Sequence, residues 1–328
     1  MRELLEIFDA EGVDSAFVFV LALHDHVHRP DGDPRAALGA EGGRRRRLRP
    51  GARCGRALAG RGPGMRNEQG TALVTGASSG IGAEYAARLS ARGWNTLLVA
   101  RRERRLDDLA RRLRAEHGTT VETLVADLSV PGDLARVAER AGEAGFLVNN
   151  AGINGYGPFA RLDPLLMAKV LNLNVVALTT LTRAAVPAML ERGRGVVVNV
   201  ASQLAFAASL PPHPLPERAV YAGTKGYAVT FTRTLAAELA GSPLRVQVLC
   251  PGLTATEFHL TRGEEPVPGD APAVHADGGM PVEQVVDASL AALDADDGQV
   301  VCVPGLRGRG PVEDLVAAEA ALRKAARR

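Results

Sequence analysis

The sequence predicts an α/β fold in which a single doubly wound parallel sheet of about seven strands carries helices on both faces. Two observations support this class. From Thr71 onward, short apolar runs alternate with longer amphipathic stretches, as they do in successive βα units. The 328-residue chain is also 46% hydrophobic and 23% charged, so it holds enough apolar material for one large buried core.

Seven short apolar runs are typical of buried parallel strands, and six longer segments between them have the apolar spacing of helices. Pro131 and Gly132 open the third helix, and Gly241 with Pro243 ends the fifth, as residues that start or stop helices should. The expected strands cover residues 72–75, 96–100, 121–126, 146–149, 196–201, 245–250 and 300–303, and the expected helices cover residues 81–92, 106–116, 134–141, 165–190, 220–239 and 282–293.

Residues 1–64 do not share this rhythm. Between Gly42 and Arg66 there are nine arginines and no acidic residue, with little apolar material to bury. We expect residues 1–64 to be a disordered basic extension, and we hypothesise that Met65 is the biological start and that the extension is not part of the native protein. A basic arm that binds nucleic acid is the alternative, but it rests on charge alone because aromatic residues do not interleave the arginines.

Composition gives little support to several other classes of protein. The net charge is only +2 and charges of both signs are mixed along most of the chain, so we expect no nucleic-acid partner and no membrane partner. The apolar run at residues 17–23 is too short to span a bilayer. Cys54, Cys250 and Cys302 fit neither a disulfide framework nor a zinc site, so we expect no metal and a reducing, cytoplasmic compartment.

A glycine-rich turn follows the first expected strand and opens the first helix. Its glycines let the backbone approach a pyrophosphate, and the free amides and dipole of the helix start attract that anion. An ordinary glycine-rich turn would look the same in isolation. The spacing, Thr75-Gly76-Ala77-Ser78-Ser79-Gly80-Ile81-Gly82, resembles the Thr-Gly-x-x-x-Gly-x-Gly motif of the short-chain dehydrogenase/reductase (SDR) family, whose members are NAD(P)-dependent oxidoreductases.

Further motifs follow in the family's order to about Gly305, so the resemblance implies a Rossmann-like dinucleotide-binding and catalytic domain in residues 65–328. It assigns cofactor contacts in the turn to Gly76, Ser78, Ser79, Gly80, Ile81 and Gly82.

Two arginines at the end of the second strand favour one nicotinamide cofactor. An acidic residue there would bind the ribose 2′-hydroxyl of NAD, whereas a guanidinium matches the 2′-phosphate of NADP. The chain has Arg101 and Arg102, so NADP is preferred and NAD is the other candidate. A solvated arginine cluster is the alternative explanation, since Arg104 and Arg105 follow.

Other strand ends carry residues that the resemblance implies contact the cofactor. Asp127 matches the position that contacts adenine, and Asn150-Ala151-Gly152 matches the family's Asn-Asn-Ala-Gly motif. After the sixth strand, a Pro-Gly motif whose backbone and threonine hold the nicotinamide is matched by Pro251, Gly252, Thr254 and Thr256. Each could instead cap a helix or begin a plain loop.

Tyr221 and Lys225 lie four residues apart at the start of an expected helix, so both side chains lie on one face. The chain has only three lysines among 39 basic residues, which makes a chance pairing improbable. The lysine cation and the oxidised nicotinamide are expected to lower the tyrosine pKa, so that Tyr221 exchanges a proton with substrate. The resemblance adds cofactor contacts from both residues.

Ser202, at the end of the fifth strand, matches the family's serine that hydrogen-bonds the substrate carbonyl; a turn cap is its plain alternative. Asn174 matches a helix asparagine that helps to relay a proton to the lysine, and it fits the spacing better than Asn172. A purely structural hydrogen bond would also account for a buried asparagine.

Two segments are expected to shape the substrate pocket. One of them makes a spacing longer than is usual in the family, and the other is expected to form a lid. Ser202 and Tyr221 are separated by eighteen residues, more than the family's usual spacing, and the surplus is the proline-rich segment 210–216. Such a loop can bulge outward at little cost or narrow the pocket. The glycine- and proline-rich segment 262–280 is expected to cover the substrate as a lid.

The sequence therefore predicts an NADP-dependent oxidoreductase that transfers a hydride between NADPH and a small-molecule carbonyl or alcohol. The alternatives are an NAD-dependent alcohol dehydrogenase and a non-catalytic dinucleotide-binding sensor on the same fold. The resemblance also implies a homodimer or homotetramer that packs through the helices at residues 165–190 and 220–239.

Overall fold

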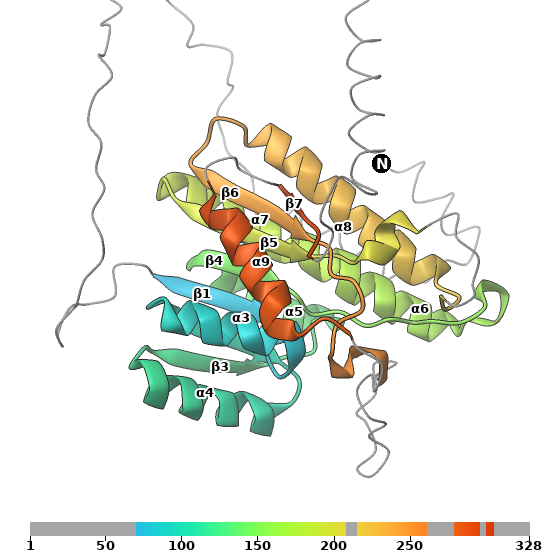
Figure 1. Ribbon diagram of the computed structural model, residues 1–328, viewed down its shortest axis with the longest axis horizontal. Coiled ribbons are helices and arrows are strands. Elements are labelled where there is room, and N and C mark those ends of the chain that lie inside the picture. The colour runs from blue at the N-terminus through green and yellow to red at the C-terminus, as the bar shows by residue number, and fades with distance from the viewer. Residues whose placement is uncertain (1–69, 208–214, 261–278, 296–299, 305–328) are drawn as a thin grey trace, which may run out of the picture. The chain divides into compact units, whose positions relative to one another are not determined.

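The computed structural model describes residues 70–207, 215–260, 279–295 and 300–304 (Figure 1). Its seven strands form one sheet in which every pairing is parallel. The strands are β1 (Thr71–Thr75), β2 (Asn95–Ala100), β3 (Val121–Val125), β4 (Ala144–Asn149), β5 (Gly195–Val200), β6 (Leu244–Leu249) and β7 (Val301–Cys302), and their order across the sheet is β3-β2-β1-β4-β5-β6-β7.

The helices join these strands as the sequence predicts, with one difference. The helix expected over residues 165–190 is two α-helices joined by a π-helical turn, η2 (Asn172–Ala177). The α-helices are α3 (Gly80–Ala91), α4 (Glu103–His117), α5 (Pro131–Ala141), α6 (Pro164–Leu171), α7 (Leu178–Glu191), α8 (Ala219–Glu238) and α9 (Val282–Asp294). Short 3-10 segments are η1 (Phe159–Arg161), η3 (Gln203–Phe206) and η4 (Glu257–Leu260).

Each face of the sheet is covered by its own helices, which makes the sheet doubly wound as predicted. Alternate residues of β1 point to opposite faces: Ala72 and Val74 join the core beneath α3, α4 and α9, whereas Leu73 joins the core beneath α5 and α7. All of these β1 residues are fully buried. The predicted α/β class with a Rossmann-like parallel sheet is confirmed.

The strand order reverses between β1 and β4. The chain runs outward from β1 through β2 to β3 and then returns to pair β4 with the other edge of β1. In open parallel sheets, ligands bind at the carboxyl ends of the strands where the order reverses. The glycine-rich turn after β1 and the Asn-Ala-Gly segment after β4 meet at this crevice.

The run Pro164–Glu191 is long and apolar enough to cross a membrane by length and composition alone. Its inner face packs into the core of this domain through Leu181 and Met189, both almost fully buried. Only 33% of its most apolar stretch is buried, so packing in this domain accounts for part of its apolar character.

Several expectations concern segments outside the described residues. These include the basic extension at residues 1–64, the hypothesis that Met65 is the biological start, most of the proline-rich segment 210–216 and most of the expected lid. They stay predictions; Leu215 and Pro216 of the proline-rich segment are described.

Candidate active site

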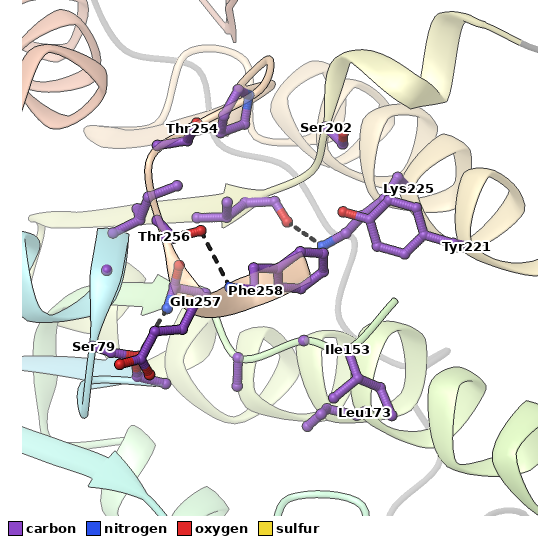
Figure 2. A pocket seen from close by; sticks show the side chains of 18 of the residues that line it. Ser79, Ile153, Leu173, Ser202, Tyr221, Lys225, Thr254, Thr256, Glu257 and Phe258 are labelled. Carbon is purple, nitrogen blue, oxygen red and sulfur yellow. Dashed lines mark hydrogen bonds between the residues drawn. The ribbon is translucent and has the colours of Figure 1, made fainter. Parts of the chain in front are cut away.

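A cavity of about 630 Å³ lies at the carboxyl ends of the strands, over the β1–β4 crevice. Its walls come from the turn after β1 and from the segments that follow β2, β3, β4, β5 and β6, together with the start of α8 (Figure 2). Nearly all of the site residues expected from the sequence line it; Gly82 and Asn174 lie just behind the wall. The lining residues among them are Gly76, Ser78, Ser79, Gly80, Ile81, Arg101, Arg102, Asp127, Asn150, Ala151, Gly152, Ser202, Tyr221, Lys225, Pro251, Gly252, Thr254 and Thr256.

The glycines of the turn after β1 are required by close packing. A Cβ on Gly82 would collide with the Gly76 carbonyl oxygen and lie 2.6 Å from Asn150 Nδ2. A Cβ on Gly80, whose φ is +54°, would lie 2.9 Å from Thr256 Cγ2. The turn is therefore pressed between the segment after β4 and the segment after β6, and side chains would not fit there.

Asn150 and Thr75 lock the ends of β1 and β4 together. The Asn150 side chain donates to the Thr75 carbonyl at 3.0 Å, and the backbone N–H groups of Asn150 and Ala151 donate to Thr75 Oγ1 at 2.9 and 3.0 Å. These bonds fix the floor of the cavity between the two strand ends. The asparagine thus positions the turn whatever direct contact it makes with a ligand.

The start of α3 fits a phosphate group. Within the described residues, Ser79 at the N-cap makes no side-chain capping hydrogen bond, so it leaves the first backbone amides of the helix uncapped. Ser78, Ser79, Gly80 and Ile81 line the cavity, and the Arg102 guanidinium lies beside both serines. Amides at a helix start together with a guanidinium are a donor set that suits a dinucleotide's phosphates.

Ser202, Tyr221 and Lys225 form what we call the tyrosine end of the cavity. Tyr221 and Lys225 lie one turn apart near the start of α8, and each is 4% exposed. Lys225 Nζ lies 5.6 Å from the centre of the Tyr221 ring and donates to the Val200 carbonyl at 2.8 Å. Figure 2 shows the two side chains facing the cavity from α8. The predicted pairing on one helix face is confirmed.

Burial governs the pKa of both groups. Burial raises the pKa of Tyr221, the neighbouring Tyr156 raises it further, and a hydrogen bond with Ser202 lowers it only in part. In the polypeptide by itself, desolvation outweighs the other effects on the tyrosine pKa. The lowering that we expect with the oxidised nicotinamide bound stays a prediction. Burial also lowers the pKa of Lys225 to about 8. The phenol is therefore protonated at neutral pH, and the lysine is close to its titration point.

Asn174 is buried in the π-helical turn and ties three segments together. Its side chain accepts from Ile153 N–H at 3.0 Å and donates to the Ile153 carbonyl at 3.0 Å and to Thr224 Oγ1 at 3.1 Å. It lies behind Gly152, where a Cβ would be 3.1 Å from Asn174 Oδ1 and 3.5 Å from Lys225 Nζ. The structure thus places Asn174 at the site in preference to Asn172, which is only half-buried.

Charged residues gather at the opposite end, which we call the arginine end: Arg101, Arg102, Arg105, Asp127 and Glu257. Arg102 donates to Ser78 and Ser79 and to the Glu257 carboxylate, while Arg105 pairs with the same carboxylate. Glu257 has no place in the sequence motifs, and only the fold brings it across 155 positions to Arg102. Sequence reasoning missed it for that reason.

Asp127 has two roles at this end. Its carboxylate accepts from the backbone N–H and the hydroxyl of Ser129, at 3.0 and 2.6 Å, and lies 3.8 Å from Arg101. Burial raises the pKa of Asp127, but these hydrogen bonds and the arginine lower it overall. It caps the turn after β3, as one alternative expected, while still facing the cavity.

Aromatic and apolar residues that the sequence did not single out surround Tyr221. The ring centres of Tyr156 and Phe258 lie 5.3 and 5.7 Å from that of Tyr221. Ile153 and Leu253 are further apolar residues that line the cavity. They follow the motifs within loops, where no period or spacing marks them out.

A doubly wound parallel sheet with a glycine-rich turn at its crevice, and a cavity that holds Ser202 beside the buried Tyr221 and Lys225, define the class of nicotinamide-dependent dehydrogenases and reductases. Residues 70–266 match the family described as short chain dehydrogenase. The chain belongs to this family, which confirms the resemblance drawn from the glycine-rich turn.

Relatives agree with this assignment. The very-long-chain 3-oxoacyl-CoA reductase of Anas platyrhynchos is 35% identical over 194 residues, and the match spans 57% of this chain and only 60% of that relative's length. A short-chain dehydrogenase from Sphingobium yanoikuyae, solved in complex with NADPH, is 36% identical with a TM-score of 0.69, covering 78% of this chain and 95% of that one.

A short chain dehydrogenase/reductase from Burkholderia phymatum, solved in complex with NAD, is 25% identical with a TM-score of 0.61, covering 73% of this chain and 90% of that one. One structural relative thus holds NADPH and another NAD. Together with the phosphate-binding geometry, they support a nicotinamide dinucleotide as the cofactor class.

Proposed function

We propose that this protein is an NADP-dependent oxidoreductase that transfers a hydride between NADPH and a carbonyl or alcohol, with Tyr221 as the general acid and base. One observation carries the proposal: a single cavity holds Ser202 with the buried Tyr221 and Lys225 at one end and an arginine anchored to the glycine-rich turn at the other. Those are the two groups of residues that such a reaction needs, one for the proton and one for the phosphates.

When bound, the nicotinamide supplies or accepts the hydride. Tyr221 donates the proton to the substrate oxygen, and burial supports this role because it keeps the phenol protonated at neutral pH. Ser202, hydrogen-bonded to Tyr221, orients that oxygen. Lys225 is cationic at neutral pH, and its charge stabilises the tyrosine oxygen as the proton leaves.

The residues after β2 support NADP over NAD. Arg101 and Arg102 stand where an acidic residue would bind a ribose hydroxyl, and both line the cavity. Arg102 is held in place by Ser78 and Ser79, so it is already oriented toward the phosphate-binding turn. NAD remains the second candidate, because Glu257 offsets part of the positive charge.

The tyrosine end favours a carbonyl with apolar substituents. Tyr156 and Phe258 pack against the Tyr221 ring, and Ile153 also lines the cavity, so burying apolar groups against these residues is favourable. A small-molecule ketone or aldehyde, or the matching alcohol, is the proposed substrate class.

We also infer a homodimer or homotetramer that packs through α6, α7 and α8. Leu165 is 80% exposed, and Leu190 and Tyr227 are each more than a third exposed. Exposed apolar side chains along neighbouring helices are better explained by a second copy of the chain than by water. A cytoplasmic location stays a prediction from the cysteine pattern.

The test is a set of initial rates for the full-length chain with a panel of aldehydes and ketones, using NADPH and NADH in parallel. We expect NADPH oxidation with at least one carbonyl and a higher kcat/KM for NADPH than for NADH. Equal or better use of NADH would overturn the cofactor assignment and favour an NAD-dependent dehydrogenase. Cofactor binding without turnover across the panel would favour a dinucleotide-binding sensor.

A further inference from the structure

Glu257 lies at the first position of η4, where the chain crosses from β6 over the phosphate-binding turn. Its two carboxylate oxygens accept hydrogen bonds from Arg102 Nη1 at 2.8 Å and from Arg105 Nη1 at 2.9 and 2.8 Å. Figure 2 shows Glu257 on the segment that runs between Ser79 and Tyr221. A carboxylate therefore lies against the arginines that the proposed function assigns to an anionic ligand.

The neighbours of Glu257 hold it in that position. Thr256 packs on the turn, since its Cγ2 lies 2.9 Å from where a Cβ of Gly80 would be. Phe258 packs its ring 5.7 Å from that of Tyr221, and its carbonyl accepts from Asn154 at 3.1 Å. Because both neighbours are fixed, forming the ion pair costs Glu257 less conformational entropy than forming a typical pair on an open surface would.

Arg102 has all three of its side-chain nitrogens engaged. Nε donates to Ser78, Nη2 to Ser78 and Ser79, and Nη1 to Glu257. Its side chain is only 19% exposed. These bonds use four of the five N–H groups, and the fifth is on Nη1, the nitrogen that also binds Glu257. A new anion at Nη1 would therefore lie close to the Glu257 carboxylate and be repelled by its charge.

Glu257 is ionised at neutral pH. Partial burial raises its pKa, but the hydrogen bonds from Arg102 and Arg105 lower it overall. The carboxylate thus offsets part of the positive charge at the arginine end of the cavity.

We propose that Glu257 is a cofactor-specificity residue: its carboxylate and the 2′-phosphate of NADP compete for the guanidinium groups of Arg102 and Arg105. The inference rests on the proposed function and deepens it. A 2′-phosphate that binds these groups meets the negative charge of Glu257 and competes with it for their hydrogen bonds, whereas a ribose 2′-hydroxyl brings no charge and can donate to a carboxylate. Glu257 therefore reduces the preference for NADP that the arginines alone would produce.

The test measures how much the 2′-phosphate contributes to binding affinity, separately from the rest of the cofactor. Adenosine 2′,5′-bisphosphate and adenosine 5′-monophosphate are titrated into the full-length chain by calorimetry, and the ratio of the two affinities isolates the 2′-phosphate. In Glu257→Gln we expect this ratio to rise about tenfold, because the phosphate no longer competes with a carboxylate for the guanidinium groups. The affinity for the monophosphate should change by less than about twofold.

Glu103→Gln is the matched control. Glu103 is exposed in the first turn of α4, next to Arg102 in the sequence, and makes no ion pair with Arg102 or Arg105 within the part of the chain that the structure describes. The Glu103→Gln variant removes the same charge from the same region, so its ratio of bisphosphate to monophosphate affinity should stay within about twofold of the wild type. Equal increases in both variants would overturn the proposal, since they would show a general charge effect.

An unchanged or lower ratio in Glu257→Gln would also overturn it. Glu257→Ala should shift the ratio in the same direction, so the result does not depend on how one variant folds; thermal unfolding monitors both. A wild-type chain that reduces carbonyls with NADPH but shows no change in either variant contradicts this inference alone. A wild-type chain that binds neither nucleotide contradicts the proposed function as well.

Discussion

Different physical effects dominate at the two ends of the cavity: desolvation at the tyrosine end and charge pairing at the arginine end. At the tyrosine end, Tyr221 and Lys225 are almost fully buried, project from one helix, and have pKa values governed by desolvation. At the arginine end, the side chains of Arg101 and Arg105 are 39% and 45% exposed, and charge pairing dominates. Substitutions at the tyrosine end should therefore have large effects that depend on pH, and those at the arginine end smaller effects that depend on salt.

The largest expected effect is that of Tyr221→Phe. Removing the proton donor should lower kcat by about 10²- to 10⁴-fold, the usual contribution of general acid catalysis. The Kd for NADPH should stay within about twofold, because the ring and its packing against Tyr156 and Phe258 remain. Steady-state kinetics and a binding titration measure the two quantities. A variant that retains most of its kcat would show that another group transfers the proton.

Lys225→Met should lower turnover by less than Tyr221→Phe does, yet stabilise the fold. Burial lowers the pKa of Lys225 from 10.5 to about 8, so below pH 8 the folded state carries a proton that it binds less favourably than the unfolded state does. This cost develops as pH falls from about 10.5 to about 8 and is complete below that range. Allowing for the lost hydrogen bond to Val200, we expect a gain of about 2 kcal/mol in unfolding free energy at pH 7.

Urea unfolding of the wild type and Lys225→Met at pH 7 and pH 10 measures this gain. The advantage of the variant should shrink at pH 10, where the unfolded lysine also begins to lose its proton. Destabilisation of the variant at pH 7 would mean that the lysine's hydrogen bond outweighs its desolvation.

At the arginine end we expect a smaller and salt-dependent effect. Arg102→Ala should weaken NADPH binding by about tenfold and NADH binding by about twofold at low salt, because the guanidinium favours the 2′-phosphate. Arg104→Ala, a neighbouring exposed arginine, is the control and should leave both affinities within about twofold. In titrations at about 0.05 and 0.5 M salt, the difference between the losses of NADPH and NADH affinity should be smaller at the higher salt concentration. Equal losses for the two cofactors would argue against a 2′-phosphate contact.

The elements that could be predicted are those that a short stretch of sequence specifies by itself. The seven strands and the helices follow from apolar periodicity, and the turn at residues 75–82 has its own glycine spacing. The π-helical turn at Asn172–Ala177 was not predicted, because Asn174 is held there by Ile153 and Thr224, which are distant in the sequence. The helical pattern carries no sign of such partners.

The same distinction applies within the site. Tyr221 and Lys225 were found because four-residue spacing on a helix fixes their relation before any fold is known. The raised pKa of Tyr221 was not foreseen, since it depends on burial and on Tyr156, both consequences of tertiary packing. The contact of Glu257 with Arg102 likewise could not be predicted, because it forms only when the segment after β6 crosses the turn after β1.

The most direct test of the central claim is deuterium transfer from labelled NADPH. The full-length chain is incubated with a ketone that it turns over and with NADPH carrying deuterium on one or the other face of nicotinamide C4, and the product is examined by mass spectrometry. The account predicts one deuterium on the carbinol carbon from one of the two labelled forms, because a fixed site exposes a single nicotinamide face. An alcohol product without deuterium from either form would contradict hydride transfer in this cavity.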